Sequence, residues 1–99
     1  MSGFAHLLAE DRRLVIVRTL AEDSDYSVND FVLKRALEQL GHGVSRDVLR
    51  ADLAWLEEQR LISVKKLDDG AVWVATATED GVDVSRGRPF PGVARPSPR

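Results

Sequence analysis

The chain has 99 residues, of which 43% are hydrophobic and 30% are charged, and its formal net charge is −2. These values fit one small domain with a modest core. The absence of cysteine excludes disulfides and thiolate metal sites, and no run approaches the roughly 18 apolar residues that cross a bilayer. We therefore expect a cytoplasmic protein without membrane contact.

Two helices are predicted in the first half of the chain. Apolar residues recur at helical spacing from Leu7 to Leu20, which indicates a helix near residues 4–21. Ser27 is a candidate N-cap for a second helix near residues 28–40, and the glycine that follows this segment suits a left-handed helix end.

A third helix is predicted near residues 46–59. Ser45 precedes it and is able to cap the free backbone N–H groups of its first turn. Leu49, Leu53 and Leu56 are spaced four and three residues apart, so they share one face of the helix. We expect this leucine face to be buried in the core.

A β-hairpin is predicted near residues 61–77. Two short runs rich in β-branched residues are separated by Asp69 and Gly70, which tolerate positive φ and therefore suit a tight turn. Thr78 then caps a short closing helix. Three helices, a two-stranded wing and a closing helix give an α+β fold, the winged helix-turn-helix.

The C-terminal end differs in composition from the rest of the chain. All four prolines and several arginines fall in its last twelve residues, and no acid does. Proline disfavours regular structure, and the segment offers few apolar residues. We therefore predict a winged-helix domain over residues 1–87 and a basic, disordered tail over residues 88–99.

Several segments carry a resemblance to known regulators. The segment "VSRDVLRADLAWLEEQRLISV" resembles the second half of the winged helix in DeoR-type repressors, and "ATATEDG" resembles a turn that follows the wing in MarR-like and ArsR-like regulators. More narrowly, "EDRRLVIVRTLAED", "GHGVSRDVLRADLAWL" and "VWVATATEDG" are similar to small ArsR-like proteins of Mu-like prophages. The resemblance implies a dimeric transcriptional regulator in a bacterial host cell, with the third helix in the major groove of double-stranded DNA.

The same resemblance identifies candidate DNA contacts. Transferred residue by residue, it places Ser45 and Arg46 at the start of the recognition helix and Arg50 at an arginine position of the repressor pattern. The chain departs from that pattern at two points. Ala51 stands where a second arginine is usual, and Arg60 replaces the glycine that ends this helix, at a position expected to be left-handed.

Charge leaves an alternative open for each of these cations. Lys65 and Lys66 on the first wing strand are able to contact the DNA backbone, or to guard a strand edge against aggregation. The two arginines of the third helix are equally able to pair with Asp47, Glu57 or Glu58. An acidic body disfavours contact with phosphate.

The second hypothesis is therefore a winged-helix module that binds protein and not DNA. Its candidate interaction surface consists of Phe4, Leu7, Val48 and Trp55, because exposed aromatic and apolar residues are typical of protein contacts. The partner would be a second copy of the chain, or a phage or host protein. Trp55 is also able to close the core against the wing. No pattern indicates an enzyme, a cofactor or a metal site.

Overall fold

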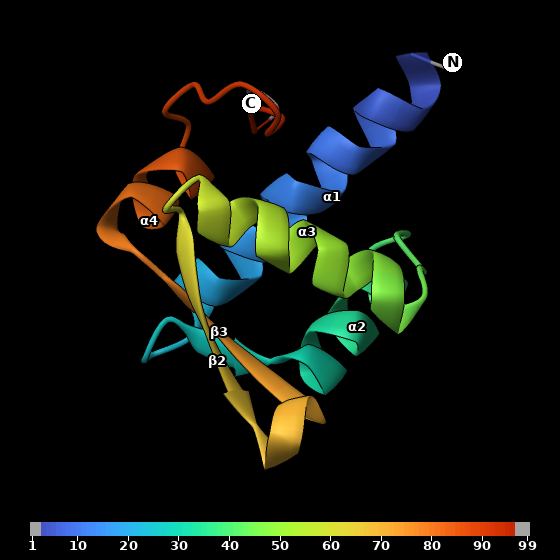
Figure 1. Cartoon of the computed structure of the whole chain (residues 1–99). Helices are drawn as coiled ribbons and strands as arrows, with labels where there is room; N and C mark the ends of the chain where they lie inside the picture. Colours follow the sequence, from blue (N-terminus) through green and yellow to red (C-terminus); the bar gives the residue numbers. More distant parts are fainter. Residues whose placement is uncertain (1–2, 97–99) are drawn as a thin grey trace.

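The computed structural model describes residues 3–96, which form a mixed α+β domain (Figure 1). The elements are α1 (Gly3–Glu22), β1 (Ser27–Asn29), α2 (Asp30–Gln39), α3 (Arg46–Glu58), β2 (Ile62–Leu67), the 3-10 turn η1 (Asp68–Gly70), β3 (Val72–Ala77) and α4 (Glu79–Ser85). This order is compatible with the predicted winged helix.

The sheet contains a strand that the sequence did not predict. Its three strands are antiparallel in the order β1, β3, β2. Strand β1 pairs with β3 through the register Ser27 to Thr76, and the hydroxyls of these two residues lie 2.7 Å apart. The prediction of Ser27 as a helix cap is therefore wrong. The N-cap of α2 is Asn29, whose side chain accepts from the Val32 N–H at 2.9 Å.

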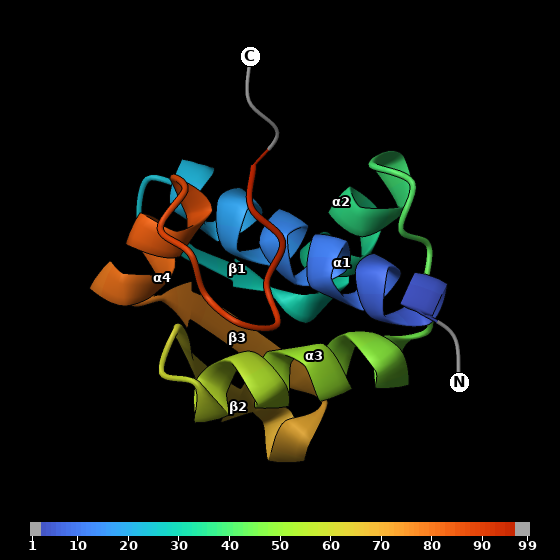
Figure 2. The same ribbon diagram turned by 90° about the horizontal axis from the view of Figure 1, so that it is seen from above.

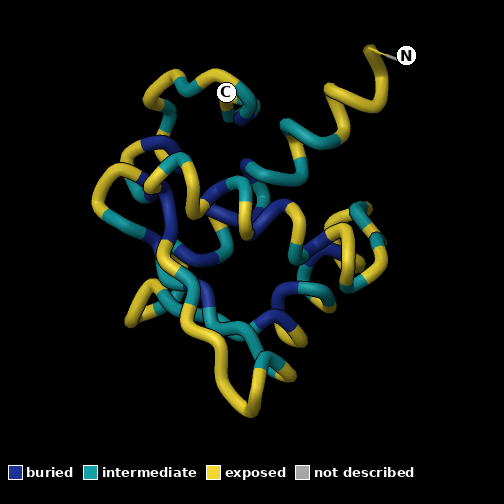
Figure 3. Tube along the Cα trace, viewed as in Figure 1, coloured by how far each residue is buried: buried dark blue, intermediate teal, exposed yellow. Residues whose placement is uncertain are grey.

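The core lies between the helices and one face of the sheet, with α1 between α2 and α3 (Figures 2 and 3). The leucine face predicted for α3 is confirmed, because Leu49, Leu53 and Leu56 have no exposed surface. From α1, the fully buried residues include Ile16 and Leu20. Both α1 and α3 thus bury apolar side chains, and the burial of apolar surface is the main contribution to the stability of the domain.

The boundaries of α3 follow the sequence closely. The Ser45 side chain accepts from the Val48 N–H at 3.2 Å, so the predicted N-cap is confirmed. Just beyond the C-terminal end of α3, Arg60 has a φ of 63°, as its position in the regulator pattern predicted. A side chain in this left-handed region costs on the order of 1 kcal/mol compared with glycine.

A buried ion-pair cluster joins α3 to α1. The Asp52 side chain of α3 is 5% exposed and pairs with Arg12 of α1. Arg13, on the next position of α1, places its Nε 3.5 Å from the same carboxylate. The carboxylate therefore has two cationic partners, which offset the cost of burying its charge.

The predicted hairpin is present, with a left-handed turn. Strands β2 and β3 pair from Ile62 with Ala77 to Leu67 with Val72. Asp69 and Gly70 have φ values of 52° and 88°, which agrees with the expected positive φ at these positions. The hairpin extends beyond the helices and is joined to them at its base (Figure 1).

The C-terminal segment corrects the prediction of a disordered tail. Over residues 88–96 the chain returns across α1 and α3 (Figure 2). The Ala94 N–H donates to the Glu10 carbonyl at 3.1 Å, and Val93 is only 5% exposed. The prolines disfavour helix and strand, but Phe90 and Val93, which lie among the prolines in the sequence, pack on the apolar core. The domain therefore continues past residue 87. The last three residues of the predicted tail lie outside the described residues.

Within residues 3–96, none of the helices is both long and apolar enough to cross a membrane.

Candidate functional site

A buried carboxylate organises the junction between α2, α3 and the hairpin. Asp30 is the first residue of α2, and its side chain has no exposed surface. Its Oδ2 accepts from the Nε atoms of Arg46 at 3.2 Å and Arg50 at 2.8 Å. Its Oδ1 accepts from the Trp73 backbone N–H at 3.1 Å. One carboxylate thus links three elements.

Both arginines of α3 also contact the hairpin directly. The Nη2 atom of Arg50 donates to the Ala71 carbonyl at 2.9 Å, and Nη2 of Arg46 donates to the same carbonyl. Arg46 lies 4.3 Å from the ring centre of Phe31, and Arg50 lies 4.7 Å from that of Trp73. We call this group the arginine cluster. It consists of Asp30, Phe31, Arg46, Arg50, Lys66 and Trp73.

The arginine cluster carries more positive than negative charge. Lys66 of β2 places its Nζ 4.4 Å from the Trp73 ring centre, so three cations accompany the single carboxylate of Asp30 and leave a formal charge of +2. The side chains of Arg46 and Arg50 remain 38% and 20% exposed. Part of each side chain is therefore accessible to solvent.

The carboxylate is held in its ionised form. Burial raises the pKa of Asp30, but the hydrogen bonds from the Trp73 N–H and from the guanidiniums of Arg50 and Arg46 outweigh it. The net result is a pKa below the ordinary value of aspartate. Asp30 is therefore charged at neutral pH, and the two arginines are paired with it and not with the acids of their own helix.

The structure separates the two lysines of β2. Lys66 lies opposite Trp73 in the strand register, whereas Lys65 lies opposite Val74. Because neighbouring residues of a strand point to opposite faces, Lys65 does not join the arginine cluster. The Ser45 hydroxyl oxygen caps α3 by accepting from the Val48 N–H. Of the predicted DNA contacts, the structure brings together only Arg46, Arg50 and Lys66.

The solvent-facing side of α3 has a different character. Asp47, Ala51, Ala54 and Glu58 recur at spacings of three and four residues, so they share one helix face, and all four are exposed. This face carries two acids and no cation. The positive charge of α3 is confined to the side that faces the hairpin, where Arg46 and Arg50 lie.

Three members of the arginine cluster were missed by the sequence analysis. The pairing of Trp73 with Lys66 follows from the hairpin register, so counting outward from the turn at Asp69 would have indicated it. No local pattern marked Asp30 or Phe31, because their partners on α3 lie in another element and are brought close only by tertiary packing.

The predicted interaction residues do not form one surface. Phe4 and Leu7 are 67% and 63% exposed, on the N-terminal turns of α1 that project from the domain (Figure 1), and Val48 is 40% exposed. Trp55 is covered instead, because the Arg13 guanidinium lies 4.1 Å from its ring centre and Phe90 meets it edge to face at 6.4 Å. It closes the core against α1 and the C-terminal segment, and not against the hairpin.

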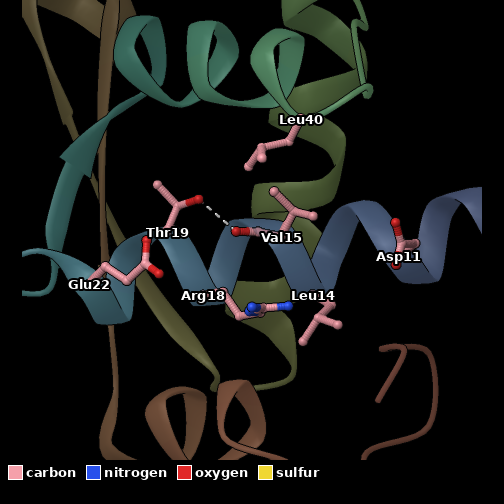
Figure 4. Close-up of a pocket in the computed structure, with 7 residues that line it drawn as sticks. All are labelled: Asp11, Leu14, Val15, Arg18, Thr19, Glu22 and Leu40. Atoms are coloured by element: carbon pink, nitrogen blue, oxygen red, sulfur yellow. Dashed lines mark hydrogen bonds between the residues drawn. The ribbon is translucent and has the colours of Figure 1, made fainter. Parts of the chain in front are cut away.

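A hollow of about 300 Å³ lies along α1 beside the C-terminal end of α2 (Figure 4). The Thr19 hydroxyl, which lines the hollow, donates to the Val15 carbonyl at 2.8 Å, so its one proton is already engaged. Charged side chains of both signs are spread along the helix. Unlike the arginine cluster, the lining of this hollow has no excess of positive side chains. Its lining consists of Asp11, Leu14, Val15, Arg18, Thr19, Glu22 and Leu40.

These observations describe a small α+β protein with a cationic cluster between a helix and a β-hairpin. No family model and no solved structure matches the chain. The chain is 46% identical over 94 residues to the uncharacterized protein gp26 of Escherichia phage Mu. The aligned residues cover 94% of this chain and 95% of that protein. It is also 41% identical over 77 residues to an uncharacterized protein of Haemophilus influenzae, and these residues cover 78% of this chain and 74% of that protein. The chain belongs to the family of phage Mu gp26.

Proposed function

We propose that this protein is a winged-helix, DNA-binding regulator of phage type. The support from the fold is the order of α2, α3 and the β2–β3 hairpin, which corresponds to a helix-turn-helix followed by a wing. In this arrangement α3 is the recognition helix and the hairpin contacts the DNA backbone. Membership of the phage Mu gp26 family supports the phage setting.

The observation that carries the proposal is the net positive charge of the arginine cluster. Affinity for DNA comes largely from cations that displace counterions from phosphate. Arg46, Arg50 and Lys66 lie at the junction of the recognition helix and the wing, where such cations are needed, and the ring of Trp73 lies against two of them. Arg46 and Arg50 lie in the N-terminal half of α3, where the helix dipole also favours a phosphate.

The two lysines of the hairpin provide a matched test. Binding of a random-sequence DNA duplex is measured by fluorescence anisotropy between about 50 and 200 mM salt. Lys66→Ala is expected to weaken binding and to lower the salt slope by about 0.9, because one phosphate contact is lost. Lys65→Ala is the control, because it removes the same charge from the opposite face of the strand. Equal effects of both substitutions, or no binding by the wild type at low salt, would refute the proposal.

A second candidate function is a winged-helix interaction module without DNA affinity. The observation that favours it is the solvent-facing side of α3, which carries Asp47 and Glu58 and would repel phosphate. The apolar N-terminal turns of α1 would then form the contact, with a second copy as the partner. Under this proposal Leu7→Glu lowers the mass measured by sedimentation equilibrium and His6→Glu, also exposed, does not. A monomeric wild type would exclude it.

A further inference from the structure

We propose that Asp30 is a positioning residue that limits the charge of the DNA-binding surface while orienting its two arginines. This inference rests on the DNA-binding function proposed above and concerns the regulation of that same site. Asp30 itself is fully buried beneath the arginines, so it does not touch DNA. It acts only through Arg46 and Arg50.

The orientation follows from the hydrogen bonds. Each arginine donates through Nε to Asp30 and through Nη2 to the Ala71 carbonyl, so each guanidinium plane is held along one edge. Within residues 3–96, neither arginine donates a hydrogen bond through its Nη1 atom. The Nη1 donors therefore remain available on a guanidinium plane whose orientation is fixed. Such donors suit a base edge or a phosphate at a defined position, because the side chain needs no further ordering when DNA binds.

Asp30 lowers the formal charge of the arginine cluster. With Asp30 ionised, three cations give +2, and without it they would give +3. An additional charge strengthens binding to every duplex, because counterion release does not depend on sequence. Asp30 therefore reduces affinity for random DNA while it keeps the arginines oriented for a particular site. The consequence is a higher ratio of specific to random binding.

A purely structural role for Asp30 makes a different prediction. If the carboxylate only holds the hairpin against α3, its replacement lowers stability and leaves the salt dependence of DNA binding unchanged. The salt slope of the folded variant separates the two roles, because the slope reports the number of phosphate charges that the protein neutralises.

The experiment compares Asp30→Asn with the wild type on random-sequence duplex and on a duplex selected by the wild type from a random pool. We expect the salt slope to steepen by about 0.9 and affinity for random duplex to rise about eightfold near 0.1 M salt. The ratio of specific to random binding falls. Asp83→Asn is the control, because Asp83 is an exposed acid of α4, at the end of the sheet opposite the hairpin turn (Figure 1). It should leave both quantities unchanged.

A second pair of variants keeps the test decisive if Asp30→Asn does not fold. Arg50→Gln and the double substitution Asp30→Asn with Arg50→Gln differ only in the Asp30 charge, and the double variant leaves a single α3 arginine at the junction. The double variant should show the steeper slope by the same amount. Equal slopes in this pair, or in folded Asp30→Asn and the wild type, would overturn the inference. Absence of DNA binding by the wild type would instead overturn the proposed function.

Discussion

Replacement of Gly92 by alanine tests the packing of the C-terminal segment. Gly92 has a φ of +92°, and a Cβ built at this position lies 2.6 Å from two ring atoms of Trp55. Its carbonyl accepts from the Arg13 guanidinium at 3.0 Å, and that guanidinium also stacks on the Trp55 ring. A methyl group here therefore displaces either the ring or the segment.

The expected loss of stability has two parts. The left-handed backbone costs about 1 kcal/mol once a Cβ is present. Displacement of the ring weakens its contacts with Arg13 and Phe90, each worth about 0.5–1.5 kcal/mol. Gly92→Ala should then lower the free energy of unfolding by about 2–3 kcal/mol. If the segment detaches locally, the loss is limited to the free energy with which it is docked.

The assay is urea unfolding followed by far-UV circular dichroism, together with the indole N–H signals of the two tryptophans in NMR spectra. Gly41→Ala is the matched control, because Gly41 has a φ of +86° and open space where the Cβ would lie. It should cost only the backbone part, about 1 kcal/mol. The Trp55 signal should shift in Gly92→Ala while the Trp73 signal stays in place. Equal losses for the two glycine variants and an unmoved Trp55 signal would show that the segment does not pack on α3.

Three further results are expected. Asp52→Asn should lower the free energy of unfolding by about 3 kcal/mol in urea titrations, because it removes the carboxylate that two arginines of α1 share; a loss below about 1 kcal/mol would show that the pair is screened by solvent. The lowered pKa of Asp30 means that its ionised form stabilises the fold above the ordinary aspartate value of 3.8, and that this contribution disappears as pH falls through the folded value. The stability difference between the wild type and Asp30→Asn should therefore shrink as the pH falls below about 5, and a constant difference would contradict the assignment. Gly81→Ala should prevent normal folding, as judged by circular dichroism, because its Cβ would lie 2.0 Å from the Leu61 carbonyl oxygen; a native spectrum with unchanged stability would refute the close approach.

Local patterns were sufficient to predict α3 and the hairpin. The leucine spacing, the Ser45 cap and the turn at Asp69 all depend on interactions within a few residues, so they are visible in the sequence. The left-handed conformation of Arg60 was predicted by position in the regulator pattern, and it is also a local property. The resemblance to the repressor pattern indicated Arg46 and Arg50, but it did not indicate their partner Asp30.

Tertiary structure decided the features that join distant segments. Ser27 was predicted to cap a helix, but pairing of its strand with β3 is available only in the folded chain. Proline content predicted disorder for the C-terminal segment, yet Val93 is buried in the core and the next residue, Ala94, donates its N–H to the Glu10 carbonyl of α1.

The candidate site shows the same division. The sequence by itself determined that the first half of α3 carries Arg46 and Arg50 and that Lys66 precedes a tight turn. Which acid neutralises those arginines depends on the approach of α2 to α3 and the hairpin, because an ion pair forms with the carboxylate that packing brings within reach and not with the neighbour in sequence. That carboxylate is Asp30, and its burial keeps solvent from screening the charge.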